Sequence, residues 1–276
     1  MLVFAIYSLT RAALQIARVA RAAFGVAVCI ALCRGEVAAQ TIIQTEGQAD
    51  SLRCILQKTA ADTTRVQALN ALGMYFCRAT AQYDSALALA NEAAQISARL
   101  RYAAGEAAAY NVLGSVRLQQ GSPSEALASL QKSLEIRKNL HSPLDLAAVY
   151  NNMGNALADL GKQAEALERY FLALELAEKH KDRKLAANSL NNIAIITLEQ
   201  GQYEKALEYH RRALGEYTAL NNPKGVAMSL NNIASVYTEM ERWEEAFKTY
   251  KEALALRESL HDKMGVARTL SNMAFI

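Results

Sequence analysis

The fold is decided by a stretch such as residues 147–174, which reads AAVYNNMGNALADLGKQAEALERYFLAL. Apolar residues return at intervals of three and four on both sides of Gly161, so the stretch predicts two amphipathic helices joined by a tight turn. Glycine readily adopts the left-handed conformation that ends a helix. We expect the two helices to cross most closely at Gly154 and Ala166, because a larger side chain would push the backbones apart.

This helix pair recurs with a period of 40 residues. One series of alanines marks the second helix of each pair, at Ala86, Ala126, Ala166, Ala206 and Ala246. A series of small residues marks the first helix, at Gly114, Gly154, Ala194, Ala234 and Ala274. Gly73 lies 41 residues before Gly114, so the first unit carries one extra residue. The period predicts an all-α solenoid of antiparallel helix pairs over residues 63–276, with five pairs and the first helix of a sixth.

The turns and junctions follow the same period. Gly121, Gly161 and Gly201 mark the turns within pairs, and Glu241 replaces the glycine in the fifth, where we expect some strain. Good N-cap residues begin the later units, and Pro143 and Pro223 follow two of them at the first helical position. These N-cap residues are Ser142, Asp182, Asn222 and Asp262. Bulky residues three before the periodic alanine are expected to wedge between helices in the core, namely Tyr83, Tyr203 and Trp243.

Residues 1–39 have the pattern of a targeting segment. Scattered arginines precede an apolar run from Ala22 to Cys33, and Val37-Ala38-Ala39 fits a signal-peptidase site before Gln40. An uncleaved membrane anchor is the alternative, although the run is short for a spanning helix. Either reading predicts an exported protein of the bacterial periplasm or cell envelope. Residues 40–62 then form a linker and a short capping helix, and Cys54 and Cys77 are expected to be two buried thiols without a bridge.

Charge and motif content limit the function. The formal net charge is +3, and four arginines against one glutamate in residues 1–39 account for it, so the remaining chain is neutral. A nucleic-acid binder needs a basic stripe, which the sequence lacks. The four histidines have neither metal-ligand spacing nor a nucleophile close in sequence. We therefore expect no enzyme activity, no cofactor, no metal site and no nucleic-acid partner.

The repeating runs resemble the tetratricopeptide repeat in its 40-residue, kinesin-light-chain-like form. The residues that carry the resemblance are runs such as Tyr150-Asn151-Asn152-Met153-Gly154 and Leu190-Asn191-Asn192-Ile193-Ala194. The resemblance implies a right-handed superhelix that binds proteins or peptides on its concave face. The layout is also similar to that of bacterial envelope sensors, through Asp50-Ser51-Leu52 and Asp62-Thr63-Thr64-Arg65. In such proteins an output module follows the repeats, so we expect this chain, which ends within a first helix, to be a fragment or to have its end covered by a partner.

The candidate site is a row of polar residues that recur along the first helices. An asparagine offers two donors and one acceptor, so such a row can hold the backbone of an extended peptide without demanding a sequence. The predicted peptide-binding residues are Asn70, Asn111, Asn151, Asn155, Asn191, Asn231 and Ser235. The alternative is that these asparagines tie neighbouring repeats together, as we expect of Asn152, Asn192, Asn232 and Asn272. Acidic residues at 159, 199 and 239 follow on the same face.

Three functions fit these patterns. The first is the extracytoplasmic sensor or interaction region of a bacterial signalling protein, whose partner is a protein or an extended peptide. The second is a free-standing exported adaptor for protein-complex assembly. The third is a receptor for a small signalling peptide. A membrane enters these hypotheses only through the N-terminal segment or through a part of the protein beyond residue 276.

Overall fold

The computed structural model describes residues 46–140 and 142–276. Within these ranges the chain forms 12 α-helices and no strands, which confirms the all-α solenoid predicted from the period. The predicted signal segment lies outside the described residues. No helix in the described part is both long and apolar enough to cross a membrane.

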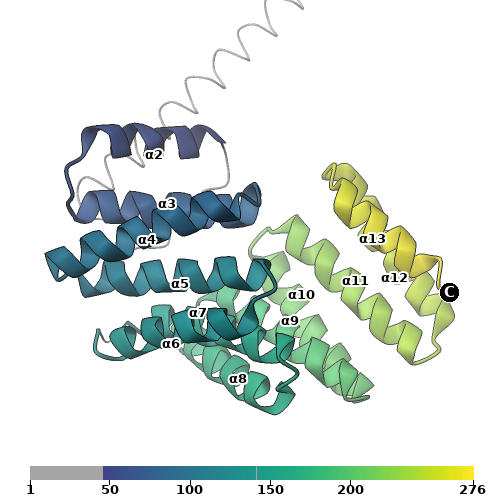
Figure 1. Ribbon diagram of the computed structural model, residues 1–276. Helices are drawn as coiled ribbons and strands as arrows, with labels where there is room; N and C mark the ends of the chain where they lie inside the picture. Colours follow the sequence, from purple (N-terminus) through teal and green to yellow (C-terminus); the bar gives the residue numbers. More distant parts are fainter. Residues whose placement is uncertain (1–45, 141) are drawn as a thin grey trace, which may run out of the picture. The chain divides into compact units, whose positions relative to one another are not determined.

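The helices fall into two compact units that meet between Leu140 and His141. In unit 1, helix α2 lies along α3, and α4 and α5 follow (Figure 1). The first helices of its two pairs are α3 and α5, and the second helices are α4 and α6. The bounds are α2 Glu46–Lys58, α3 Thr63–Ala79, α4 Tyr83–Leu100, α5 Ala103–Gln119 and α6 Pro123–Lys138.

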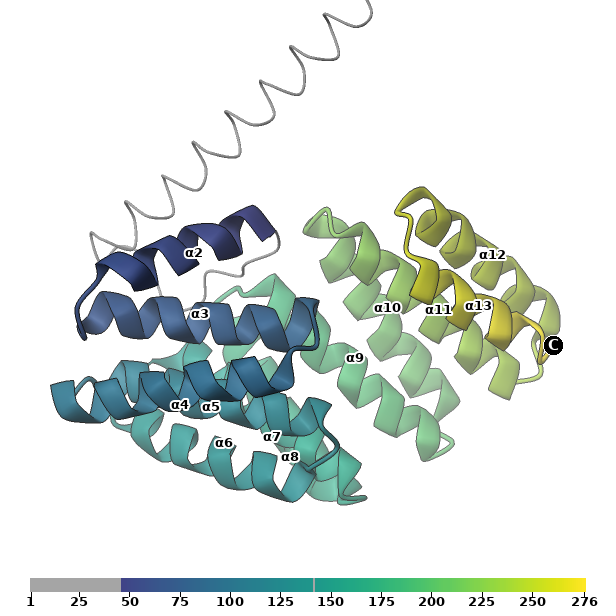
Figure 2. The ribbon, with the colours of Figure 1, turned by 45° about the horizontal axis from the view of Figure 1, so that its top comes forward.

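Unit 2 repeats the same hairpin. Its first helices are α7, α9, α11 and α13, and each of the first three is followed by its second helix, α8, α10 or α12. In Figure 2 the pairs of this unit succeed one another in chain order. The bounds are α7 Pro143–Asp159, α8 Gln163–Lys179, α9 Arg183–Glu199, α10 Tyr203–Ala219, α11 Pro223–Glu239, α12 Trp243–Ser259 and α13 Lys263–Met273.

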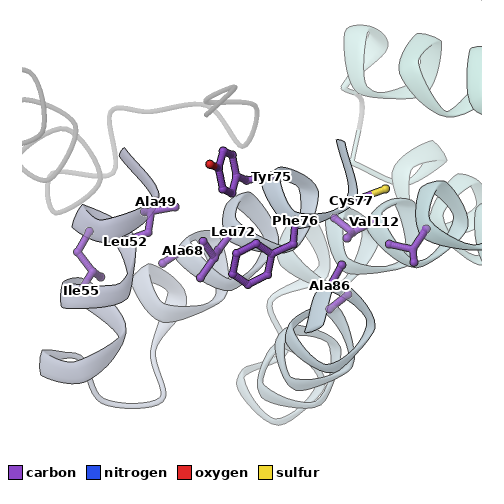
Figure 3. Close-up of a cluster of buried hydrophobic side chains, with 12 residues drawn as sticks. Ala49, Leu52, Ile55, Ala68, Leu72, Tyr75, Phe76, Cys77, Ala86 and Val112 are labelled. Carbon is purple, nitrogen blue, oxygen red and sulfur yellow. The ribbon is translucent and has the colours of Figure 1, made fainter. Parts of the chain in front are cut away.

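Helix α2 buries one apolar face against the first pair of unit 1. Ala49 and Leu52 of α2 are fully or almost fully buried, and they lie in one cluster with Leu72 and Phe76 of α3 (Figure 3). The same cluster continues through Ala86 and Val112 into α4 and α5. Each buried aliphatic side chain of this kind contributes about 1.5–3 kcal/mol relative to its exposed state, so α2 is held by tertiary packing.

The turns within pairs adopt the predicted conformation. Gly121, Gly161 and Gly201 have φ angles of 72°, 73° and 73°. Glu241 takes the same left-handed conformation with φ 57°, although a side chain there disfavours it. The expected strain at the fifth turn is therefore present.

The junctions between pairs are capped mostly as predicted. The side chains of Asp182, Asn222 and Asp262 each accept a hydrogen bond from the backbone N–H three residues on. Ser142 differs, because its hydroxyl donates to the Asp145 carboxylate at 2.7 Å and makes no side-chain cap to a backbone N–H. Asp145 is the acceptor that the pattern of N-cap residues did not reveal.

Two expectations about single residues were wrong. Trp243 is 47% exposed and is not a core wedge, whereas Tyr83 and Tyr203 are half-buried. In unit 2, Tyr203 packs with Tyr237 and Met240 of α11, a first helix that follows it by one pair. Both cysteines are free as expected, but only Cys77 is buried and Cys54 is exposed.

The Glu241→Gly variant is expected to be more stable than the wild type by about 1 kcal/mol, because glycine removes the penalty for a left-handed residue. Chemical denaturation of the two proteins measures the difference. The matched control is Gly201→Ala, which places a side chain in the equivalent turn and is expected to lose a similar amount. Equal stability of Glu241→Gly and the wild type would contradict the strain at this turn.

Candidate functional site

The predicted site residues of unit 2 lie where successive first helices meet. Asn151, Asn191 and Asn231 are 8%, 6% and 4% exposed. The Oδ1 atom of each accepts a hydrogen bond from an asparagine Nδ2 of the next first helix, 41 residues on. These bonds are Asn192 to Asn151 at 3.3 Å, Asn232 to Asn191 at 2.8 Å and Asn272 to Asn231 at 3.5 Å. We call these six asparagines the amide ladder.

A hydroxyl reinforces two rungs of the amide ladder. Ser189 donates to Asn151 Oδ1 at 3.2 Å, and Thr269 donates to Asn231 Oδ1 at 3.2 Å. Both donors lie 38 residues after their acceptor and are fully buried. Ser229 occupies the equivalent place before Asn232, and its hydroxyl is buried without a hydrogen-bond partner among the described residues. The repeats are therefore joined by paired donors that converge on one carbonyl oxygen.

Asn155 and Ser235 hold the tyrosines of the second helices. Tyr170 donates its hydroxyl hydrogen to Asn155 Oδ1 at 2.8 Å, and the hydroxyls of Ser235 and Tyr250 lie 2.9 Å apart. Burial raises the pKa of Tyr170, with further contributions from the charges of Asp159 and Glu199. These bonds run from the amide ladder into the core of each pair.

The middle pair of unit 2 lacks this polar link. The period places Ile195 where Asn155 and Ser235 stand, and His210 where Tyr170 and Tyr250 stand. Ile195 is 38% exposed, so it forms an apolar point on an otherwise polar row. His210 is fully buried, and neither ring nitrogen has a hydrogen-bond partner among the described residues. Burial lowers its pKa to about 4, so the imidazole is neutral at pH 7.

The two predicted site residues of unit 1 belong to a less regular arrangement. Asn70 is buried and donates from Nδ2 to the main-chain oxygen of Gly105 at 3.0 Å. Asn111 is half-buried, and its main-chain oxygen accepts a hydrogen bond from Ser115 at 2.9 Å. Asn70 therefore ties α3 to α5 through a backbone atom and not through a second asparagine.

The structure thus places every predicted peptide-binding residue and gives most of them a bond within the protein. The alternative weighed from the sequence, that the asparagines join neighbouring repeats, describes the bonds of Asn151, Asn191 and Asn231. Contact with a peptide by the seven residues stays a prediction. Ser189, Thr269 and Ile195 were not among the expected site residues, although the 40-residue period would have identified the Ser-Ser-Thr series at 189, 229 and 269.

Groups typical of catalysis do not gather in the described part of the chain. No three histidine, cysteine, aspartate or glutamate side chains there lie close enough to hold a metal ion. Burial raises the pKa of the Cys77 thiol, which makes it a poor nucleophile. The described residues offer hydrogen-bonding amides and charged helix ends, which are means of binding.

The fold and the amide ladder define a helix-pair repeat protein whose repeats are joined by asparagine side chains. The model of the tetratricopeptide repeat family matches residues 64–139, 145–217 and 225–276. The chain therefore belongs to the tetratricopeptide repeat family, a family of helical scaffolds. No curated protein sequence matches the chain.

Solved structures share the fold. BtubC (BKLC) from P. vanneervenii has 23% identity and a TM-score of 0.61, covering 69% of this chain and 81% of its own. A Rap protein complexed with competence and sporulation factor has 16% identity and a TM-score of 0.63, covering 83% and 68%. The apo form of the quorum sensor NprR from B. thuringiensis has 16% identity and a TM-score of 0.64, covering 82% and 63%. At these identities the likeness concerns the fold.

Removal of one rung is expected to weaken the solenoid. In Asn231→Ala, the donors of Thr269 and Asn272 lose their shared acceptor, which costs about 1–3 kcal/mol. Urea denaturation of the variant and the wild type measures the loss. Asn91→Ala, at an exposed position of α4, is the control and should leave stability nearly unchanged. An Asn231→Ala protein as stable as this control would show that the amide ladder does not hold the repeats together.

Acid is expected to destabilise unit 2 through His210. The folded pKa of about 4 lies below the ordinary value of 6.5, so between these pH values the unfolded chain binds a proton that the folded chain does not. The free energy of unfolding therefore falls as the pH drops from 6.5 to 4, by up to about 3 kcal/mol, and this term changes no further below pH 4.

Denaturation at pH 7.5 and pH 4.5 tests this dependence. His210→Leu introduces the residue that stands at the equivalent position 130, and it should lose less stability on acidification than the wild type. An equal loss in both proteins would assign the acid sensitivity to other groups.

Proposed function

We propose that this chain binds an extended peptide, or an extended segment of a partner protein, across the amide ladder of unit 2. The observation that carries the proposal is the fixed orientation of the carboxamides. Every hydrogen bond that the described residues make to the side chains of Asn151, Asn191 and Asn231 uses Oδ1. Their Nδ2 donors are thereby turned away from the next repeat.

The second asparagine of each rung complements the first. Asn192 donates from Nδ2 to Asn151 and also to Asn155 at 3.0 Å, so its Oδ1 is left as an acceptor. Asn192 and Asn232 are half-buried, which leaves part of each carboxamide at the surface. A row that presents both donors and acceptors matches the N–H and C=O groups of an extended backbone. Such a row reads a backbone and tolerates many sequences.

The biological setting follows from the sequence features and from the fold relatives. The pattern of residues 1–39 favours export, and the layout before the repeats resembles that of bacterial envelope sensors. We therefore propose that the chain is the sensor or interaction region of an exported bacterial signalling protein. A relative of the same fold is complexed with competence and sporulation factor, and another is a quorum sensor. These likenesses support peptide capture as the binding mode.

Panning a random peptide library on the purified protein tests the binding mode. The affinity of an enriched peptide is then measured against Ile195→Arg and Phe171→Arg. Ile195 lies on the amide face of α9, whereas Phe171 is 44% exposed on the second helix α8. We expect Ile195→Arg to bind at least about tenfold more weakly, because an arginine there obstructs the row, and Phe171→Arg to bind as the wild type does.

Two outcomes would overturn the proposal. One is the absence of any enriched peptide whose binding saturates. The other is a peptide whose affinity falls with Phe171→Arg and not with Ile195→Arg, because it would then bind the outer helices. The two variants carry the same substitution at positions of similar exposure, so a difference between them reports the face of the solenoid and not the added charge.

A further inference from the structure

The first helices of unit 2 carry charges at the ends where the helix dipole disfavours them. Asp159, Glu199 and Glu239 are the last residues of α7, α9 and α11. Lys184 and Lys224 are the second residues of α9 and α11. A helix has partial positive charge at its N-terminus and partial negative charge at its C-terminus, so all five positions oppose the dipole.

The second helices of the same unit follow the opposite pattern. Acidic residues occupy the first turn of α8, α10 and α12, with Glu165, Glu204 and Glu244 as examples. Lys179 and Arg257 lie in the last turns of α8 and α12. The unfavourable placement is therefore confined to the helices that carry the amide ladder. Departures from a stabilising rule that gather on one surface are typical of functional sites.

The charges form two rows that flank the amide ladder. Along α9, Lys184, Asn188, Asn192, Ile195 and Glu199 follow one another at intervals of three and four, so they share one face. The equivalent face of α11 runs from Lys224 through Asn232 to Glu239. Hydrogen bonds between residues 38 and 41 apart show that neighbouring first helices run parallel and in register. A basic row and an acidic row therefore lie on opposite sides of the amide ladder.

The ionisable groups at these rows show the same asymmetry. At the acidic row, burial raises the pKa of Asp159, and Glu199 accepts a hydrogen bond from Gln163 at 2.9 Å. At the basic side, burial lowers the pKa of Arg257, and the exposed Arg268 of α13 lowers it further while Asp262 raises it. The buried Arg257 guanidinium donates to the Gly265 main-chain oxygen and to Thr269, which are neutral acceptors. Positive charge therefore gathers at this end of the amide ladder.

We propose that the ligand of this face is an extended segment whose side chains alternate between acidic and basic. The inference rests on the proposed function, because it takes a backbone lying along the amide ladder as given. Successive side chains of an extended chain point to opposite sides, so one set meets the basic row of Lys184, Lys224 and Arg268. The other set meets the acidic row of Asp159, Glu199 and Glu239. Charges that oppose the helix dipoles in the empty protein are then paired in the complex.

Three decapeptides test this specificity on the purified chain. One alternates glutamate and lysine, a second has the same residues in two blocks, and a third alternates serine and threonine. We expect the alternating-charge peptide to bind at least about tenfold more tightly than the block peptide of identical composition, with an affinity that falls as salt is added. Equal binding of the two charged peptides would overturn the proposal.

A charge exchange within α11 connects the specificity to the helix dipole. Lys224→Glu combined with Glu239→Lys keeps the net charge, aligns both charges with the dipole and interrupts both rows. We expect the melting temperature to rise while binding of the alternating peptide weakens by about tenfold. The matched control exchanges Glu165→Lys and Lys179→Glu in the second helix α8, where we expect a lower melting temperature and unchanged binding.

The outcomes separate this inference from the proposed function. If library panning enriches neutral peptides that Ile195→Arg excludes, and these bind the α11 exchange variant normally, the charge rows are not part of recognition although peptide capture stands. If panning enriches no peptide, the proposed function itself fails. Weaker binding in the α11 exchange variant and not in the α8 control supports the charge rows as specificity determinants.

Discussion

The structure depends on the close approach of two helices at small residues within each pair. Ala166, Ala206 and Ala246 of unit 2 are completely buried, and each faces the small-residue position of its first helix. At Gly154 even a methyl group would come within 2.4 Å of the Tyr170 ring. This spacing brings the tyrosines of the second helices within hydrogen-bonding distance of Asn155 and Ser235. The polar row on the first helices is therefore a consequence of how closely each pair packs.

The amide ladder shows how one residue type can serve packing and recognition together. A carboxamide has an acceptor and two donors on opposite sides of one carbon, so a bond through Oδ1 to the next repeat fixes where Nδ2 points. Asn151 and Asn231 accept two hydrogen bonds each, which leaves their side chains little freedom to rotate. A binding row with preset orientation loses little conformational entropy when a ligand arrives. Structural bonding and peptide capture are compatible in this arrangement.

Unit 2 also contains features that lower its own stability. His210 is buried with both nitrogens unpartnered, where its neighbours in the repeat are hydrogen-bonded tyrosines. The charges at the ends of α9 and α11 oppose the helix dipole, and Glu241 occupies a left-handed turn. The first two lie at or beneath the face that we assign to peptide binding, and the turn lies outside it. A protein tolerates such features when the rest of the solenoid supplies enough buried surface.

The sequence by itself determined the helix pairs, their period and their turns. These depend on local causes, namely the apolar spacing of three and four, the glycines at the left-handed turns and the N-cap residues. The repeating asparagines were also recognisable from the sequence, but their partners were not. A bond from Asn232 to Asn191 joins residues 41 apart, and only the packing of one pair on the next brings those side chains to 2.8 Å.

The tertiary structure likewise decided the environment of single residues. The pattern predicted that Trp243 lies in the core, as bulky residues at that position do elsewhere in the chain. It is instead 47% exposed, because burial of such a side chain requires contacts from another element. Ile195 and His210 show the same dependence, since their departure from the polar link became visible only beside the bonded pairs on either side. Local pattern decides which element a residue joins, and packing decides what its side chain meets.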